Sequence, residues 1–333
     1  MMSREHSAII KGIGILFMMI CHLDFVSGRE LLNNAFSHTL ANASHMVNYF
    51  LIVSGYGLYL VYEKGRLSWN YLFTRSLRLY IAFWLILLIF PVLLGSVLYP
   101  GRFSYSWYKL ITNFTGVRWD YCNFTWFLLP YVLMVFSSKA VFKIIDKVGN
   151  VISFFIGAAL YLVSSWLISR FFVTWFREHY LVYQIVLAAQ TLFGLIIGAI
   201  MARIVLSGKS LKIPFFEGRS WLVLLIFLVL YVLRGQIHSA ALNPFFAIIA
   251  VLMVVNIDWP RPVARLLSAL GNQSMLMWLV QGFVGAFMFK EYYQPLHWPA
   301  LIWIVWVIIT YLTTCLLKPM TDRLNSLLKL SKA

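Results

Sequence analysis

The residues of this sequence best suited to chemistry are a lysine and a histidine near opposite ends of one apolar stretch. The stretch KGIGILFMMICHL begins at Lys11 and contains His22 as its penultimate residue. On an α-helix this spacing is three turns plus about 20°, so both side chains lie on one face, about 16 Å apart along the axis. A neutral imidazole can accept a proton, which makes His22 a candidate general base with a cation three turns away.

Both residues also have structural explanations. Lys11 lies only a turn inside the start of the predicted span 8–27, where a lysine can extend its ammonium group to the inner membrane surface. His22 could instead hydrogen-bond between packed helices, or lie at the outer rim beside Asp24. On a continuous helix Asp24 faces away from His22, so it could orient the ring only where the helix frays.

A second apolar segment, SHMVNYFLIVSGYGLYL, carries small residues at its centre and a histidine at its outer end. Ser54 and Gly55 allow either a neighbouring helix or a slender ligand to approach the backbone. His45 is a candidate substrate-binding residue, and the alternative is a histidine at the membrane interface.

Two arginines follow at the start of the third apolar segment. Arg75 and Arg78 are three residues apart, so they share a helix face. Two neighbouring guanidinium groups are suited to bidentate binding of phosphate. The alternative is that they are the positive charge usual at the cytoplasmic end of a membrane helix.

The composition predicts that helices in a bilayer position these residues. Of the 333 residues 62% are hydrophobic and 11% are charged, and the mean hydropathy is +0.82, whereas soluble domains are about half apolar and a quarter charged. Ionisable groups are costly in hydrocarbon, so Lys11 and His22 indicate function. We expect one all-α transmembrane domain over residues 1–333, a single bundle of about ten helices in the cell membrane. The predicted spans are 8–27, 43–62, 77–99, 125–142, 150–169, 183–203, 220–234, 240–257, 270–289 and 299–317.

The charge distribution predicts the orientation of the bundle. Most of the 27 basic residues fall in segments on the same side as the N-terminus when ten spans are counted. The positive-inside rule then places both termini in the cytoplasm. The net charge of +16 is explained by these loops beside an anionic membrane surface, which argues against a nucleic-acid partner.

Several kinds of site are not indicated by the sequence. None of the 11 acidic residues lies at the centre of a predicted span, so a carboxylate relay of the kind that ion-coupled transporters use is not expected. The histidines lack HxxxH spacing and the three cysteines lack ligand spacing, so we expect no metal. GxSxG, Walker and GxGxxG motifs are also missing from the sequence.

Taken in order, these segments resemble the acyltransferase-3 family of multi-span membrane acyltransferases, especially the bacterial branch that O-acetylates sugars and polysaccharides. Lys11-x10-His22 is similar to the family's basic-x10-His signature, and Arg75-x-x-Arg78 to its paired arginines. The segment HMVNYFLIVSGYG also matches in position. Weaker similarities are TWFLLPYVL from Thr125 and LGNQSMLMWLVQGF from Leu270.

The sequence departs from the family pattern at three places. Lys11 stands where arginine is more usual, Val47-Asn48 replaces Pro-Leu, and Gln281 occupies a late position often held by histidine. A lysine keeps the charge but loses the bidentate fork. The glutamine removes a catalytic role for that late position and indicates a diverged acceptor site.

The resemblance implies an acyl-CoA donor, with acetyl-CoA as the default, that enters from the cytoplasm. Arg75 and Arg78 would bind the CoA phosphates, and Ser54 and Gly55 would border the pantetheine arm. Lys11 would stabilise the donor through a phosphate or a pantetheine carbonyl. The resemblance gives no oligomeric state, so a homo-oligomer stays open.

The resemblance also implies a hydroxyl acceptor on a sugar, polysaccharide or other envelope glycan. His22 would be its general base, with an acyl-His22 intermediate as a variant. Arg118 and Trp119, in an aromatic loop predicted to lie outside, could hold the glycan or belong to an interfacial aromatic belt. The competing function classes are a transporter or flippase of an envelope precursor, and a membrane sensor or scaffold.

Overall fold

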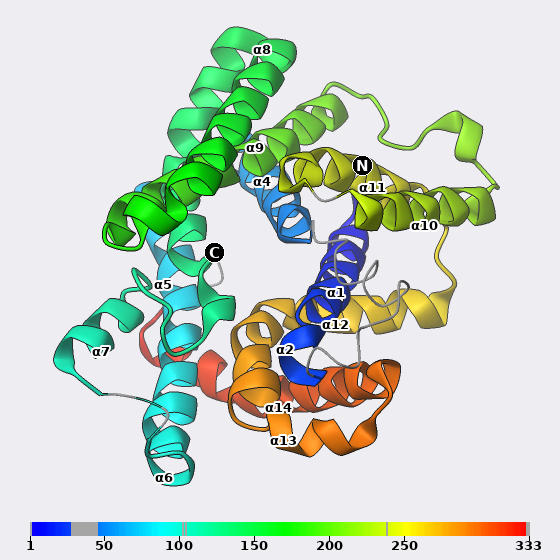
Figure 1. The fold of residues 1–333 in the computed structure, drawn as a ribbon. Coiled ribbons are helices and arrows are strands. Elements are labelled where there is room, and N and C mark those ends of the chain that lie inside the picture. Colours follow the sequence, from blue (N-terminus) through cyan, green and yellow to red (C-terminus); the bar gives the residue numbers. More distant parts are fainter. Residues whose placement is uncertain (1, 28–45, 102, 104, 238, 331–333) are drawn as a thin grey trace.

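The computed structural model describes residues 2–27, 46–101, 103, 105–237 and 239–330 (Figure 1). Within these ranges the chain is helical and contains no strand. The helices are α1 (Arg4–Cys21), α2 (Leu23–Ser27), α4 (Val47–Glu63), α5 (Trp69–Leu87), α6 (Gly95–Leu98), α7 (Trp107–Phe114), α8 (Leu128–Phe171), α9 (Tyr180–Leu206), α10 (Ser220–Gln236), α11 (Asn243–Asn256), α12 (Arg261–Gly282), α13 (Lys290–Tyr293) and α14 (Pro299–Leu327).

The helical content agrees with the predicted all-α membrane protein. Within the described ranges, four helical segments are long and apolar enough to cross a membrane by length and composition, namely Trp69–Leu98, Asn123–Phe176, Tyr180–Leu206 and Pro299–Leu327. The second is bent at Gly149, whose φ of 83° is left-handed and suits a residue without Cβ. Its two arms correspond to two predicted spans. The number of crossings and the direction of insertion stay predictions.

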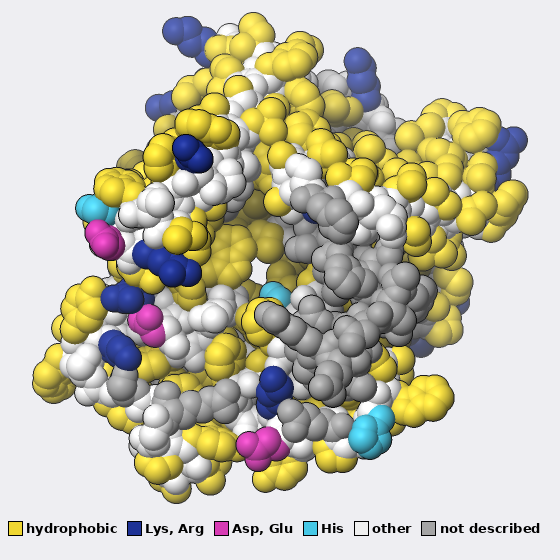
Figure 2. Space-filling view, in the orientation of Figure 1, with side chains coloured by type: hydrophobic (Ala, Val, Ile, Leu, Met, Phe, Trp, Pro, Cys, Tyr) yellow, Lys and Arg dark blue, Asp and Glu magenta, His cyan; other side chains and the backbone are white. Residues whose placement is uncertain are grey.

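Hydrophobic side chains cover most of the face shown in Figure 2, and the basic side chains gather at a few places near its edges. This face is hollowed at its centre, between the part that carries α7 and α8 and the part that carries α12 to α14 (Figures 1 and 2). An apolar outer surface is what contact with lipid tails requires.

Helix α1 is defined at both ends by local interactions. At its start, the Ser3 side chain accepts a hydrogen bond from the backbone N–H of His6, and the His6 ring interacts with Ser3 in return. This reciprocal capping satisfies N–H groups that have no partner within the helix. At its end, His22 leaves helical geometry with φ −96° and ψ 3°, and α2 follows at once.

Glycines bring α1 into backbone contact with α12. A Cβ at Gly12 would lie 2.1 Å from the carbonyl oxygen of Leu267, and one at Gly271 would lie 1.8 Å from that of Ala8. Only hydrogen fits in so little space, so the two backbones approach more closely than other residues would allow. One turn further along α1, Trp303 of α14 donates a hydrogen bond to the carbonyl of Leu16. These contacts fix the position of α1.

A similar contact joins α4 to α9. A Cβ at Gly55 would lie 2.3 Å from the carbonyl oxygen of Leu195, and one at Gly198 would lie 2.1 Å from that of Ile52. Gly55 therefore serves the packing of two helices, which is one of the two uses expected for it.

We predict that Gly55→Ala destabilises the bundle by about 1–3 kcal/mol, because the new methyl group must separate two backbones. Thermal unfolding in detergent, followed by tryptophan fluorescence, measures the effect. Gly57→Ala is the control, since Gly57 is exposed on the same helix with no atom within 4 Å of its Cβ position. It should be neutral or stabilising through helix propensity. Equal unfolding temperatures for the two variants would contradict the packing role.

Candidate active site

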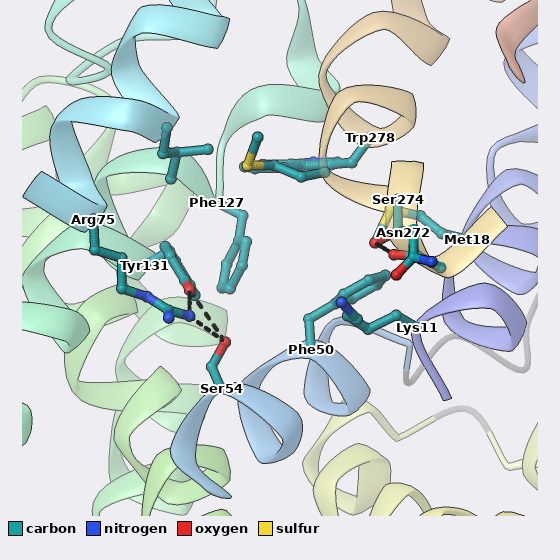
Figure 3. Close-up of a pocket in the computed structure, with 13 residues that line it drawn as sticks. Lys11, Met18, Phe50, Ser54, Arg75, Phe127, Tyr131, Asn272, Ser274 and Trp278 are labelled. Carbon is teal, nitrogen blue, oxygen red and sulfur yellow. Dashed lines mark hydrogen bonds between the residues drawn. The ribbon is translucent and has the colours of Figure 1, made fainter. Parts of the chain in front are cut away.

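A cavity of about 250 Å³ opens between α1, α4, α5, α8 and α12 (Figure 3). Its lining combines aromatic side chains, two cations and a few neutral polar groups, and it includes no aspartate or glutamate. The lining residues are Lys11, Met18, Phe50, Ser54, Arg75, Leu79, Phe127, Tyr131, Gly271, Asn272, Ser274, Met275 and Trp278. Such a mixture suits a ligand with an anionic part and a slender, mostly uncharged part.

Arg75 is held toward this cavity by two hydroxyl groups. Its Nη2 donates a hydrogen bond to Tyr131 Oη at 2.8 Å and lies 3.5 Å from Ser54 Oγ. The two hydroxyl oxygens are 3.1 Å apart, so they form one acceptor cluster. Arg75 Nε is buried and has no hydrogen-bond partner among the described residues. The guanidinium is thus oriented but keeps a donor for a ligand.

Lys11 approaches the same space from the opposite wall. In Figure 3 its ammonium group points into the cavity beside Phe50, across from Arg75 and Tyr131. It lies close enough to both Tyr131 and Arg75 for electrostatic interaction. Two like charges that share a cavity repel each other, so an anion between them would stabilise the site.

Arg78 lies at the neighbouring cavity, of about 260 Å³, between α5, α12 and α14. Arg75 belongs to the lining of both cavities, and so do Leu79, Asn272 and Met275. Lys318 adds a further cation there, paired with Asp322 at 2.8 Å. Arg75 and Arg78 therefore line the second cavity together, and Arg75 also lines the first.

His22 lies just beyond the other end of the first cavity, one helical turn after Met18. Its ring stacks on Phe124, with the ring centroids 4.0 Å apart and the planes 5° from parallel. Trp278 donates a hydrogen bond to the carbonyl of Phe124 at 2.8 Å, which holds the stacking partner in place. The ring is thus positioned by an aromatic platform. For Asp24, in α2, the structure describes the backbone alone.

The comparison with known protein families identifies the chain. Residues 8–318 match the acyltransferase domain of the acyltransferase-3 family, which is nearly the whole chain. The chain belongs to the acyltransferase-3 family. It is a membrane acyltransferase, as the resemblance implied. No curated protein and no solved structure matches it.

Gln281 of this acyltransferase lies beside His22, although its sequence position suggested no part in catalysis. Its side chain is fully buried, at 0% exposure. Neither amide atom of Gln281 makes a hydrogen bond of normal geometry among the described residues, and the same is true of Nδ1 of His22, although the amide lies close enough to the imidazole to interact with it. Tyr131 is another polar residue that sequence reasoning did not select. Both lie in the segments that carried the weaker similarities to the family, which is the signal that could have found them.

The structure places the remaining candidates elsewhere. Ser54 lines the first cavity, whereas Gly55 faces α9. Arg118 stacks its guanidinium over Tyr180 at 4.3 Å and pairs with Asp120 at 3.2 Å. It lines a separate cavity of about 300 Å³ that shares no residue with the first.

Trp119 packs against Tyr180 and Tyr183 at the edge of this separate cavity. His45 lies outside the described residues. No group of three or more metal-binding side chains occurs within the described ranges.

We predict that Tyr131→Phe raises the KM of the acyl donor about tenfold, because Arg75 loses its 2.8 Å hydrogen bond and thereby its orientation. Steady-state transfer in detergent at varied donor concentration measures this. Tyr80→Phe is the control, since that hydroxyl binds the backbone carbonyl of Thr115, outside the first cavity. If both variants kept the donor KM of the wild type, the prediction that Tyr131 orients Arg75 for donor binding would be wrong.

Proposed function

We propose that the protein transfers an acetyl group from cytoplasmic acetyl-CoA to a hydroxyl of a sugar, polysaccharide or other envelope glycan, with His22 as the general base. One observation carries the proposal. Lys11 and Arg75 face each other across a cavity whose lining contains no carboxylate, and that cavity ends about one helical turn short of His22.

The donor suits the two adjoining cavities in both charge and shape. CoA carries phosphates on a long pantetheine arm that ends in the thioester. Arg75, Arg78 and Lys318 would bind the phosphates where the cavities meet. The arm would run past Ser54 and Phe127 toward Trp278, where the lining is mostly apolar and aromatic. Lys11 would stabilise a phosphate or a carbonyl of the arm.

The reaction then takes place at the end of this path. The acceptor hydroxyl attacks the thioester carbonyl, so that a C–O bond forms and the C–S bond breaks. The imidazole of His22 takes the hydroxyl proton and passes it to the leaving sulfur, which releases CoA as a thiol. In the variant with a covalent intermediate, His22 itself takes up the acetyl group before the hydroxyl does.

The glycan would extend from this point toward the predicted outer face. Arg118 and Trp119, together with Tyr180, offer a cation and aromatic rings to a sugar. Their cavity is separate from the first, so they would hold a part of the glycan away from the reacting hydroxyl.

We expect His22→Ala to lower acetyl transfer at least about 100-fold, because the base is lost. The assay incubates membranes with radiolabelled acetyl-CoA and measures label on glycan. His297→Ala is the matched control, since His297 is exposed and lines neither the donor cavities nor the cavity of Arg118. Near-normal labelling by the His22 variant would contradict the role of His22 as general base. A transporter, flippase or scaffold would show no labelling at all.

The double variant Arg75→Ala, Arg78→Ala should raise the KM for acetyl-CoA at least tenfold, because charge-assisted hydrogen bonds to phosphate are lost. Arg261→Ala, Arg265→Ala removes the same charge from exposed positions at the start of α12 and should leave the KM near that of the wild type. If both double variants kept a KM near that of the wild type, the phosphate site would be contradicted. Arg75 and Arg78 would then be only the positive charge at the cytoplasmic end of a membrane helix.

A further inference from the structure

Three unpaired polar atoms meet in the interior of the bundle. They are Nδ1 of His22 and both side-chain amide atoms of Gln281, and none makes a hydrogen bond of normal geometry among the described residues, although the amide and the imidazole lie close together. Gln281 is at 0% exposure. A buried amide left without partners costs about 1–3 kcal/mol, and folded proteins rarely retain one without a reason.

Neighbouring residues fix the main chain at Gln281, whereas its side-chain amide makes no hydrogen bond of normal geometry among the described residues. Trp306 of α14 donates a hydrogen bond to the main-chain carbonyl of Gln281 at 3.1 Å. The next residue, Gly282, packs against Cys122 and Phe124, where a Cβ would lie 2.5 Å and 2.8 Å away. The main chain at position 281 therefore cannot shift easily, and the amide is presented at a defined place beside the ring of His22.

This place is also where the path of the donor ends. Met18 and Trp278 line the first cavity. His22, the residue that caps α1, follows Met18 by about one turn, and Gln281 follows Trp278 by about one turn on α12. The pair thus lies about 5 Å beyond the cavity lining, on the same side of both helices. A thioester that reaches Trp278 comes within reach of a hydroxyl bound by this pair.

We infer that Gln281 binds the acceptor and recognises two adjacent hydroxyl groups of a sugar. The inference rests on the proposed function and specifies its acceptor. A neutral amide offers a donor and an acceptor at once. Its NH2 group would donate to the oxygen of the attacking hydroxyl, whose proton goes to His22. Its carbonyl oxygen would accept the proton of the neighbouring hydroxyl.

A vicinal diol satisfies both amide atoms, whereas a single alcohol leaves the carbonyl oxygen unpaired. A site built to hydrogen-bond a hydroxyl discriminates strongly against the analogue that lacks it, because its own buried group then stays unsatisfied. Gln281 is therefore a residue that determines acceptor specificity and positions the nucleophile.

The test replaces the amide with an apolar side chain of similar shape, Gln281→Met. Acceptors are a panel of methyl pyranosides with adjacent free hydroxyls, each compared with its monodeoxy analogues, and acetyl-CoA is the donor. The wild type should favour the best diol over its deoxy analogue by about tenfold or more. The variant should lose this preference and show a raised acceptor KM, while the donor KM stays unchanged.

Stability separates this role from a structural one. Because the amide makes no hydrogen bond of normal geometry among the described residues, Gln281→Met should unfold at the same temperature as the wild type or higher. Gln184→Met is the matched control. Gln184 is also at 0% exposure, but its Nε2 donates to the carbonyls of Gly116 and Val117. That variant should unfold at a lower temperature and keep the preference for diols.

A binding measurement without donor keeps the inference distinct from the proposed function. Methyl pyranosides should raise the unfolding temperature of the wild type and of Gln184→Met, but not of Gln281→Met. The inference is overturned if Gln281→Met keeps the wild-type preference for diols, or if its stabilisation by the pyranosides is unchanged. If His22→Ala transfers acetyl normally while stabilisation still depends on Gln281, then the proposed function fails and the acceptor site stands.

Discussion

The contact between the backbones of α1 and α12 is the constraint on which the site depends. Gly12 and Gly271 each face a carbonyl oxygen of the other helix at a distance that no side chain tolerates. The two helices run in the same direction, because Ala8 contacts Gly271 while His22, further along α1, lies beside Gln281. One close crossing therefore brings Lys11 to the cavity that Asn272 and Ser274 of α12 line, and it brings His22 to Gln281.

The electrostatics of the site follow from the lack of acidic side chains among the described residues that line the first cavity. Lys11 and Arg75 face a common cavity, and the residues that line it include no carboxylate. Charges in a medium of low dielectric constant need a partner, since water cannot screen them there. Here the hydroxyls of Tyr131 and Ser54 orient one cation but do not neutralise it. An anionic donor would neutralise the charges of Lys11 and Arg75 when it binds.

The end of the site that holds His22 depends on a segment outside the predicted spans. Phe124, in the short turn η3 (Asn123–Thr125), enters the bundle and stacks on His22. Trp278 bonds its carbonyl, and Gly282 provides the space that its ring occupies. The orientation of the imidazole is thus coupled to the loop that also carries Arg118. A glycan that moved this loop on binding would therefore change the position of the His22 ring through Phe124.

The sequence by itself determined the membrane class, the helical fold and the family, and it predicted a shared helix face for Lys11 and His22. These follow from hydropathy and from spacings within single helices, which are local properties of the chain. It did not determine that Gly55 turns to α9, that Arg78 lines a second cavity, or that Gln281 meets His22. Those relations join residues on different helices, and only the close packing of the bundle decides which faces meet.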